Sequence, residues 1–255
     1  MATVITITLR KGGSGKTTTA VNLASSLSKH GKKVLLIDLD PQANATAGLG
    51  LDTQSLPNIA DVLQGVHPIQ HTINDPLKGF DLIPSNQILA QIEATLATDP
   101  AKYATIIKDL ISPLLPRYDY ILIDTPPSES MLTVTALIAS DYALIPTQAH
   151  YFAIHGLQQA LELISRVKEG YEANVEVLGI LPTMVQTGTN VAEMFIEQVN
   201  TDYPDLLLPY PVPHSIKLTE SQLASEPITD YDPHHPASKA YMQLAEHITK
   251  RGKQK

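Results

Sequence analysis

The chain has 255 residues, of which 43% are hydrophobic and 17% are charged, a balance typical of a globular protein with a sizeable core. It carries 18 Lys and Arg residues against 26 Asp and Glu residues, a formal net charge of -8 at pH 7, so contact with nucleic acid or a membrane requires a local basic patch. Cysteine is absent, which excludes disulfides, iron–sulfur clusters, thiolate metal sites and thiol nucleophiles.

The N-terminus begins with a strand-like run at residues 4–9, rich in β-branched side chains. It has no basic flank and no long apolar stretch, so we expect a strand rather than a signal peptide. Nowhere does the sequence reach the ~20 consecutive apolar residues of a membrane-spanning helix. We therefore expect a cytoplasmic protein.

Strand-like and helix-like segments alternate along the chain. Strands are expected at residues 4–9, 34–37, 120–123, 142–145 and 175–181, and helices at 16–29, 154–168 and 238–255. Short apolar runs without polar alternation are typical of parallel strands that helices cover on both faces. The pattern predicts a doubly wound α/β fold with a mostly parallel sheet. No low-complexity linker divides it, so we expect a single domain over residues 1–255.

A glycine-rich segment lies between the first expected strand and the first expected helix. It reads Lys11-Gly12-Gly13-Ser14-Gly15-Lys16-Thr17-Thr18, a variant of the phosphate-binding loop in which Arg10 stands at the position of the usual first glycine. Its glycines allow backbone N–H groups to surround a phosphate, and the helix points its positive end at the anion. We expect Lys16 to reach the β- and γ-phosphates and Thr17 to bind Mg²⁺. A ligand-free turn is the alternative, which the position between strand and helix disfavours.

Two expected strands end in aspartates. Asp38 and Asp40 follow the run 34–37, and Asp124 follows the run 120–123. Ligands gather at the carboxyl ends of strands in open α/β sheets, and a strand closed by aspartate is typical of a Mg²⁺-binding carboxylate in nucleotide hydrolases. Asp38 and Asp40 taken alone could also be turn formers. Together with the loop, the carboxylates predict hydrolysis of a nucleoside triphosphate.

The three motifs, at residues 11–18, 38–46 and 124–127, together resemble the ParA/MinD family of deviant Walker A ATPases, which are P-loop NTPases. Segments 144–148, 151–157 and 213–218 are also similar to ParA sequences, so the resemblance covers nearly the whole chain. Family members commonly carry Asn-Gln before the first loop lysine, whereas this chain has Leu9-Arg10. Arg10 is either a further positive charge near the phosphates or a surface residue.

The resemblance implies a homodimer that encloses two ATP molecules with Mg²⁺. Lys11 would reach the nucleotide of the partner subunit and couple hydrolysis to dimerisation. Asp40 would orient or activate the attacking water, and Asp38 would support Mg²⁺ and the switch segment, although the assignment between these two stays open. Asp124 would hold Mg²⁺ through its water ligands. The residues implied around the nucleotide are Gly12, Gly13, Ser14, Gly15, Lys16, Thr17 and Thr18 at the phosphates, with Met184, Pro211, Val212 and Pro213 at the adenine.

The missing cysteines exclude the redox branch of the family. In a ParA-type protein, the ATP dimer binds double-stranded DNA without sequence preference, and a small adaptor on the cargo stimulates hydrolysis. The cargo would be a plasmid, a chromosome or a protein organelle such as the carboxysome, and the protein would associate with the nucleoid.

A MinD-like protein would instead use a C-terminal amphipathic membrane helix. The six residues after Thr249 contain no apolar side chain, which favours DNA. A metabolic ATP-dependent enzyme is a third possibility, without a recognisable substrate motif.

The expected DNA surface is a basic patch that contacts phosphates, so binding should be sensitive to salt. Taken singly, each residue in it is also compatible with a solvated surface charge. Its expected residues are Arg166, Lys168, Lys217, Lys239, Lys250 and Arg251, with Lys253 and Lys255 in the same tail.

Overall fold

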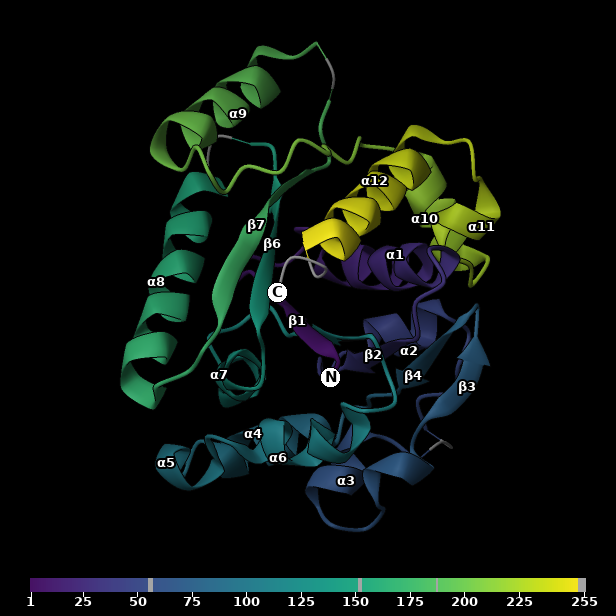
Figure 1. Ribbon diagram of the computed structural model, residues 1–255, viewed down its shortest axis with the longest axis vertical. Helices are drawn as coiled ribbons and strands as arrows, with labels where there is room; N and C mark the ends of the chain where they lie inside the picture. Colours follow the sequence, from purple (N-terminus) through teal and green to yellow (C-terminus); the bar gives the residue numbers. More distant parts are fainter. Residues whose placement is uncertain (55–56, 151–152, 187, 252–255) are drawn as a thin grey trace.

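The computed structural model describes residues 1–54, 57–150, 153–186 and 188–251, which form a twisted sheet between two layers of helices (Figure 1). The strand order is β3-β4-β2-β5-β1-β6-β7, and all neighbouring strands are parallel except β3 and β4. The predicted doubly wound, mostly parallel α/β fold is therefore confirmed. The strands are β1 (Thr3–Ile7), β2 (Val34–Asp38), β3 (Asn74–Leu77), β4 (Phe80–Ile83), β5 (Tyr120–Asp124), β6 (Tyr142–Gln148) and β7 (Glu176–Thr183).

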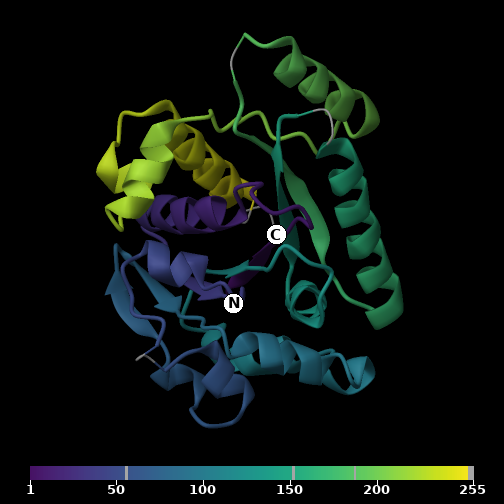
Figure 2. The same ribbon diagram turned by 180° about the vertical axis from the view of Figure 1, so that it is seen from behind.

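The helices cover both faces of the sheet (Figures 1 and 2). α1 packs with α12 on one face, whereas α7 packs with α6 and α8 on the other. None of the helices in the described part of the chain is long and apolar enough to cross a membrane. The helices are α1 (Lys16–Lys29), α2 (Asn44–Gly48), α3 (Ile59–Leu63), α4 (Leu89–Leu96), α5 (Pro100–Tyr103), α6 (Ile106–Ile111), α7 (Met131–Ile138), α8 (Ala153–Tyr171), α9 (Asn190–Asp202), α10 (Ile216–Leu223), α11 (Ile228–Tyr231) and α12 (Pro236–Arg251), with short 3₁₀ turns at Ile69–His71 and Ser112–Leu114.

The central strands are apolar on both faces because each face meets a layer of helices. On β2, Leu36 packs into the core below α1, while Leu35 and Ile37 pack into the core on the opposite face. All five residues of β2 and of β5 are buried. Their carboxyl ends, at Asp38 and Asp124, lie side by side in register, which brings two of the three sequence motifs to the same edge of the sheet.

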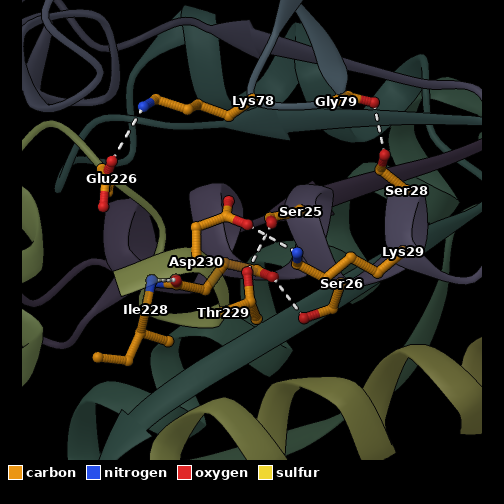
Figure 3. Close-up of polar contacts among 11 residues, drawn as sticks. Ser25, Ser26, Ser28, Lys29, Lys78, Gly79, Glu226, Ile228, Thr229 and Asp230 are labelled. Carbon is orange, nitrogen blue, oxygen red and sulfur yellow. Dashed lines mark hydrogen bonds and ion pairs between the residues drawn. The ribbon is translucent and has the colours of Figure 1, made fainter. Parts of the chain in front are cut away.

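Polar contacts hold the segment around α11 against α1 (Figure 3). The hydroxyls of Ser25 and Thr229 lie 2.6 Å apart, and Lys29 pairs with Asp230 at 2.6 Å. The buried Asn22 side chain accepts a hydrogen bond from the Ile228 N–H at 2.7 Å and donates one to the Thr18 carbonyl at 2.7 Å. These bonds fix the C-terminal segment, and α10 just before it, next to the helix that begins at the glycine-rich loop.

The observed elements follow the predicted ones closely in the central sheet. The helix at Lys16–Lys29 is as predicted, and the strands at β5, β6 and β7 extend two or three residues beyond their predicted apolar runs at most. The first strand ends at Ile7 rather than at residue 9, because the chain turns into the glycine-rich loop there. β3, β4, the helices α2 to α7 and the helices α9 to α11 were not predicted. Residues 151 and 152, the start of the ParA-like segment 151–157, lie outside the described residues. Residues 253 and 255 of the basic tail also lie outside them.

Candidate functional site

A cavity of about 530 Å³ opens at the carboxyl ends of the parallel strands. The loops after β1, β2, β5 and β7 contribute to it, together with α2 and α10. The structure therefore brings the glycine-rich loop and Asp40 to one space. Its lining residues are Gly12, Gly13, Ser14, Gly15, Lys16, Thr17, Thr18, Asp40, Asn44, Ala47, Gly48, Pro127, Met184, Thr219, Gln222 and Leu223.

The glycine-rich loop has the backbone geometry of a phosphate cradle. Gly13 and Gly15 have φ angles of 70° and 86°, a left-handed region that favours glycine. The Gly15 carbonyl accepts a bond from the Thr19 N–H at 2.8 Å, which opens α1. The first N–H groups of that helix consequently face the cavity end of α1 without partners inside the helix.

Lys16, in the first turn of α1, is 7% exposed. Burial lowers the pKa of its ammonium group, while the nearby carboxylates of Asp124 and Asp40 act in the opposite direction. The lysine therefore lines the cavity close to two negative groups. This arrangement suits an ammonium group that binds a polyphosphate anion. When no anion is bound, the two carboxylates balance the charge of the lysine.

The carboxylate of Asp124 is completely buried, and although the Thr17 hydroxyl is near it, neither of its oxygens has a well-aligned hydrogen bond among the described residues. Burial raises its pKa well above the ordinary value, and the neighbouring Asp38 adds to the rise, whereas the Thr17 hydroxyl and Lys16 lower it. A buried carboxylate without well-aligned hydrogen bonds is costly unless a cation satisfies it. The Thr17 hydroxyl and the Asp124 carboxylate supply the hard oxygen atoms that Mg²⁺ prefers, so these residues fit a magnesium ion.

Asp38 and Asp40 differ in what they contact. The Asp38 carboxylate is fully buried, accepts bonds from the Thr46 N–H at 2.9 Å and the Thr46 hydroxyl at 2.7 Å, and does not line the cavity. Burial raises its pKa to about 6, and the bonds from Thr46 oppose the rise. Asp40 lines the cavity, and one of its oxygens accepts the Gln42 N–H at 2.9 Å. Asp38 thus anchors α2 to β2, while Asp40 faces the space where a ligand would bind.

Ser85, which the sequence motifs did not include, forms hydrogen bonds to Asp40 and to Thr46, the partner of Asp38. Its hydroxyl donates to the Asp40 carbonyl at 2.8 Å, and its N–H donates to the Thr46 hydroxyl at 3.0 Å. Ser85 follows β4, so it obeys the same strand-end rule as Asp38 and Asp124. The signal was missed because the run 80–83 was not identified as a strand.

A second cavity, of about 190 Å³, adjoins the first and shares Gly15, Thr18 and Met184 with it. Val212 and Pro213 also line it, whereas Pro211 is exposed and lies outside it. The structure therefore places three of the four expected base-binding residues together. Gln222 of α10 lies between the two cavities and donates to the Thr18 hydroxyl at 3.0 Å. No pattern in the sequence marks this glutamine, because α10 reaches the site only through tertiary packing.

Lys11 and Arg10 do not line the cavity of their own chain. Lys11 is exposed, does not line the cavity and lies beside α8, where its Cβ is 4.0 Å from the position a Cβ on Gly156 would take. Arg10 forms an ion pair with Glu129 at 3.6 Å, and its side chain is 53% exposed.

The six basic residues expected at a DNA surface lie on three helices. Arg166 and Lys168 are on α8, Lys217 is on α10, and the other three are on α12. Lys168 and Lys239 are exposed. The remaining four have partners: Arg166 with Glu129 at 2.9 Å, Lys217 with Glu220 at 2.8 Å, Lys250 with Glu246 at 2.7 Å, and Arg251 with the Leu178 carbonyl at 3.3 Å.

Two basic residues, Lys250 and Arg251, lie at the C-terminal end of α12. A surface cavity of about 560 Å³ lies there, lined by Tyr210, Gln243, Glu246, His247, Lys250 and Arg251. Partial burial lowers the pKa of His247, and the positive charges of Arg251 and Lys250 lower it further. Of the six residues expected at a DNA surface, Lys250 and Arg251 lie together at this end of the helix, where Lys250 is paired with Glu246.

Comparison with known proteins shows a family match over most of the chain. Residues 2–177 match the model of a family described as an AAA domain. The sporulation initiation inhibitor protein Soj of Bacillus subtilis is 36% identical over 260 residues, which cover 99% of this chain and 100% of Soj. The chain belongs to the ParA/MinD family of ATPases. Another member, the chromosome partitioning protein ParA of Myxococcus xanthus, is 36% identical over 97% of this chain and 88% of its own.

A solved structure of the same ParA/MinD fold has a nucleotide in place. The structure of cobyrinic acid a,c-diamide synthase from Mycobacterium smegmatis with bound ADP and magnesium is 30% identical to this chain. It covers 99% of this chain and 96% of its own, with a TM-score of 0.86. The likeness confirms the P-loop NTPase fold predicted from the sequence.

The buried carboxylate of Asp124 predicts a pH-dependent gain in stability for Asp124→Asn. A carboxyl whose pKa rises on folding above its ordinary value of 3.8 stabilises the fold below that pH, and this contribution is lost as the pH rises through the folded-state pKa. Without ligand and with EDTA present, the variant should match the wild type in urea unfolding near pH 4. Near pH 7.5 it should have a higher free energy of unfolding than the wild type, because the wild type then keeps a buried charge that the amide lacks.

The control is Asp99→Asn, because Asp99 caps α5 at the surface and asparagine caps a helix equally well. This variant should follow the wild type at both pH values. A variant Asp124→Asn that is less stable than the wild type at pH 7.5 would show that the buried carboxylate is not a strained charge.

Proposed function

We propose that this protein is a Mg²⁺-dependent ATPase that acts as a homodimer and uses ATP hydrolysis to position a cargo on DNA. The observation that carries the proposal is the single cavity in which the phosphate loop and Asp40 converge above the buried Asp124. Family membership supports it, since relatives at 36% identity are named for sporulation control and chromosome partitioning. We also propose that residues 1–255 form one domain, because α12 packs on α1 and completes the core of the same sheet.

The loop residues would bind the triphosphate. Backbone N–H groups of the loop and of the first turn of α1 donate to the phosphate oxygens, and Lys16 contributes a positive charge. Bound Mg²⁺ would neutralise charge on the β- and γ-phosphates. The Thr17 hydroxyl would hold that ion directly and the Asp124 carboxylate would hold its water ligands. The adjoining cavity at Met184, Val212 and Pro213 would take the adenine.

Asp40 would orient the attacking water, because it is the strand-end carboxylate that lines the cavity. Asp38 would act at a distance from the water. Its bonds to Thr46 fix α2, whose residues Asn44, Ala47 and Gly48 form one wall of the cavity. A change at the γ-phosphate would reach α2 through this wall.

Lys11 would act on the nucleotide of the partner subunit. Its exposure and its position outside its own cavity suit a cation that is supplied across an interface. Such a group stabilises the charge on the transferring phosphoryl group only when two subunits meet. Hydrolysis would therefore depend on dimerisation.

The DNA surface would centre on the C-terminal end of α12, where Lys250 and Arg251 create a positive potential around His247. Contacts to phosphates alone give binding without sequence preference. A small adaptor on the cargo would stimulate hydrolysis and release the protein from DNA, and the protein would reside with the nucleoid in the cytoplasm. The cargo would be a plasmid, a chromosome or a protein organelle.

A second candidate is an ATP-dependent amide-forming enzyme on the same fold. It is favoured by the likeness, at 30% identity, to a structure of cobyrinic acid a,c-diamide synthase. Such an enzyme would hydrolyse ATP only with an acid substrate and an amine donor present, and its rate would not respond to DNA. The partition ATPase is preferred because relatives with that role match at higher identity over the full chain.

Replacement of Lys16 by Ala should abolish binding of ATP. The variant loses the one mostly buried cation of the cavity and leaves Asp124 and Asp40 uncompensated. Isothermal titration with ATP and Mg²⁺ should show at least a hundredfold weaker affinity, on the order of the 2 to 3 kcal/mol of a charge-assisted contact. The control Lys102→Ala, on the surface of α5, should bind as the wild type does. Retained affinity in Lys16→Ala would contradict the phosphate-site assignment.

Asp40→Asn should bind ATP but turn it over slowly. The amide keeps an acceptor for the Gln42 N–H but removes the base, and loss of a positioned base slows such reactions roughly 10²- to 10⁴-fold. With ATP present, size-exclusion chromatography with light scattering should show accumulation of a dimer. A variant that stays monomeric and hydrolyses ATP at the wild-type rate would exclude Asp40 from the reaction.

Binding to DNA should require ATP and fall steeply with salt. Neutralising several phosphates releases counterions, so affinity should drop by a factor of ten or more between about 50 and 200 mM salt. The double variant Lys250→Ala/Arg251→Ala should bind weakly, and the matched control Lys102→Ala/Lys108→Ala, on exposed parts of α5 and α6, should bind normally. Unrelated DNA sequences should compete equally. ATP-dependent binding to anionic vesicles without binding to DNA would favour the MinD-like alternative.

A further inference from the structure

The glycine-rich loop is held from a second direction, by the end of strand β7. The Thr183 hydroxyl donates a hydrogen bond of 2.8 Å to the carbonyl of Ser14. Thr183 is 3% exposed and is the last residue of its strand. Two strands, β1 and β7, therefore determine the shape of the loop, although only β1 is continuous with it in the chain.

The bond to the Ser14 carbonyl also fixes the next N–H group. In a trans peptide the carbonyl and the N–H of the following residue point in opposite directions. With the Ser14 carbonyl turned toward Thr183, the Gly15 N–H is turned away from it. Among the described residues no acceptor is found for that N–H, and Gly15 lines the cavity.

Packing around Gly15 reinforces this orientation. The Thr183 Cβ and methyl carbon both lie 3.7 Å from the position that a Cβ on Gly15 would take, so Thr183 contacts the loop with its carbon atoms as well as its hydroxyl. Gly15 has a left-handed φ of 86°. Because glycine can adopt many other backbone conformations, a contact from outside the loop is needed to hold it in this one. The carbonyl of Thr183 is itself bound by the Ala149 N–H at 2.9 Å, which secures the end of β7 to β6.

We propose that Thr183 is a positioning residue that pre-orients the Gly15 N–H toward the β-phosphate of the bound nucleotide. The inference rests on the proposed ATP site and adds to it a residue from outside the loop. Thr183 lines the second cavity but not the first, so any effect that it has at the phosphates passes through the Ser14–Gly15 peptide. The following residue, Met184, lines both cavities, so the same strand end contacts the phosphate side and the base side of the site.

The test compares Thr183→Val, which keeps the shape and removes the donor, with Thr183→Ser, which keeps the donor. In isothermal titration with ATP and Mg²⁺, Thr183→Val should weaken binding roughly tenfold, and Thr183→Ser should stay within about threefold of the wild type, because one net hydrogen bond is at stake. In steady-state assays of Thr183→Val, the KM for ATP should rise by about the same factor as the affinity falls, while kcat changes little. The reason is that the pre-oriented N–H binds the ground state and the transition state alike.

Thr147→Val is the matched control. Thr147 is a fully buried threonine near the end of the neighbouring strand β6, and its hydroxyl bonds to the Ile145 carbonyl of its own strand. This variant should lose a buried hydroxyl without changing ATP affinity. Should Thr183→Val fail to fold, Thr183→Cys replaces it, because a thiol is a weak donor of nearly the same size, and it should bind more weakly than Thr183→Ser.

Lys16→Ala separates this inference from the proposed function. If the wild type binds ATP and Lys16→Ala does not, the site stands. The inference is then overturned when Thr183→Val binds like the wild type, when Thr183→Ser loses as much affinity as Thr183→Val, or when Thr147→Val loses as much. A wild-type protein that binds no ATP overturns both.

Discussion

The site depends on the burial of negative charge beneath a phosphate loop. Asp124 and Asp38 stand side by side at the ends of β5 and β2, both fully buried, and Asp124 has no well-aligned hydrogen bond among the described residues. Burial raises the pKa of both carboxyls, the charge of Asp38 adds to the rise at Asp124, and the empty site is disfavoured. Lys16 offsets part of this repulsion, so the lysine and the carboxylates constrain one another before any ligand arrives. The protein thus forgoes some stability for a site prepared to receive a cation and an anion together.

The parallel sheet makes this concentration of charge possible. Strands that run in the same direction present their carboxyl ends at one edge, and helices on both faces keep that edge dry except at the cavity. Asp38 and Asp40 differ in their contacts. Asp38 is fully committed to Thr46 and the backbone of Asp40, whereas Asp40 faces the cavity. Burial and hydrogen bonding therefore favour Asp40 over Asp38 for the proposed role at the attacking water, a choice that the sequence left open.

The sequence predicted the parts of the site that depend on local chain order. The loop at residues 11–18 and the aspartates at strand ends are recognisable because each motif is contiguous with the strand that positions it. Ser85, Thr183 and Gln222 were not recognised, since each reaches the site from an element whose place is set by long-range packing. A lone hydroxyl or amide carries no sequence signal. The strands β3 and β4 were missed for a related reason: the run 80–83 is short, and the edge strand β3 pairs with it in the antiparallel direction.

The C-terminal helix links the nucleotide cavities to the basic surface through one rigid element. Tyr241, in the middle of α12, lines the second cavity, and its hydroxyl lies 3.3 Å from that of Thr19 on α1. Lys250 and Arg251 lie about two to three turns further along the same helix, since an α-helix has 3.6 residues per turn. Arg251 in turn contacts β6 and β7, through the Tyr142 ring at 5.2 Å and the Leu178 carbonyl at 3.3 Å. The basic end of α12 is therefore attached to the same sheet whose opposite edge forms the phosphate site, so its orientation is fixed by the fold rather than by a free tail.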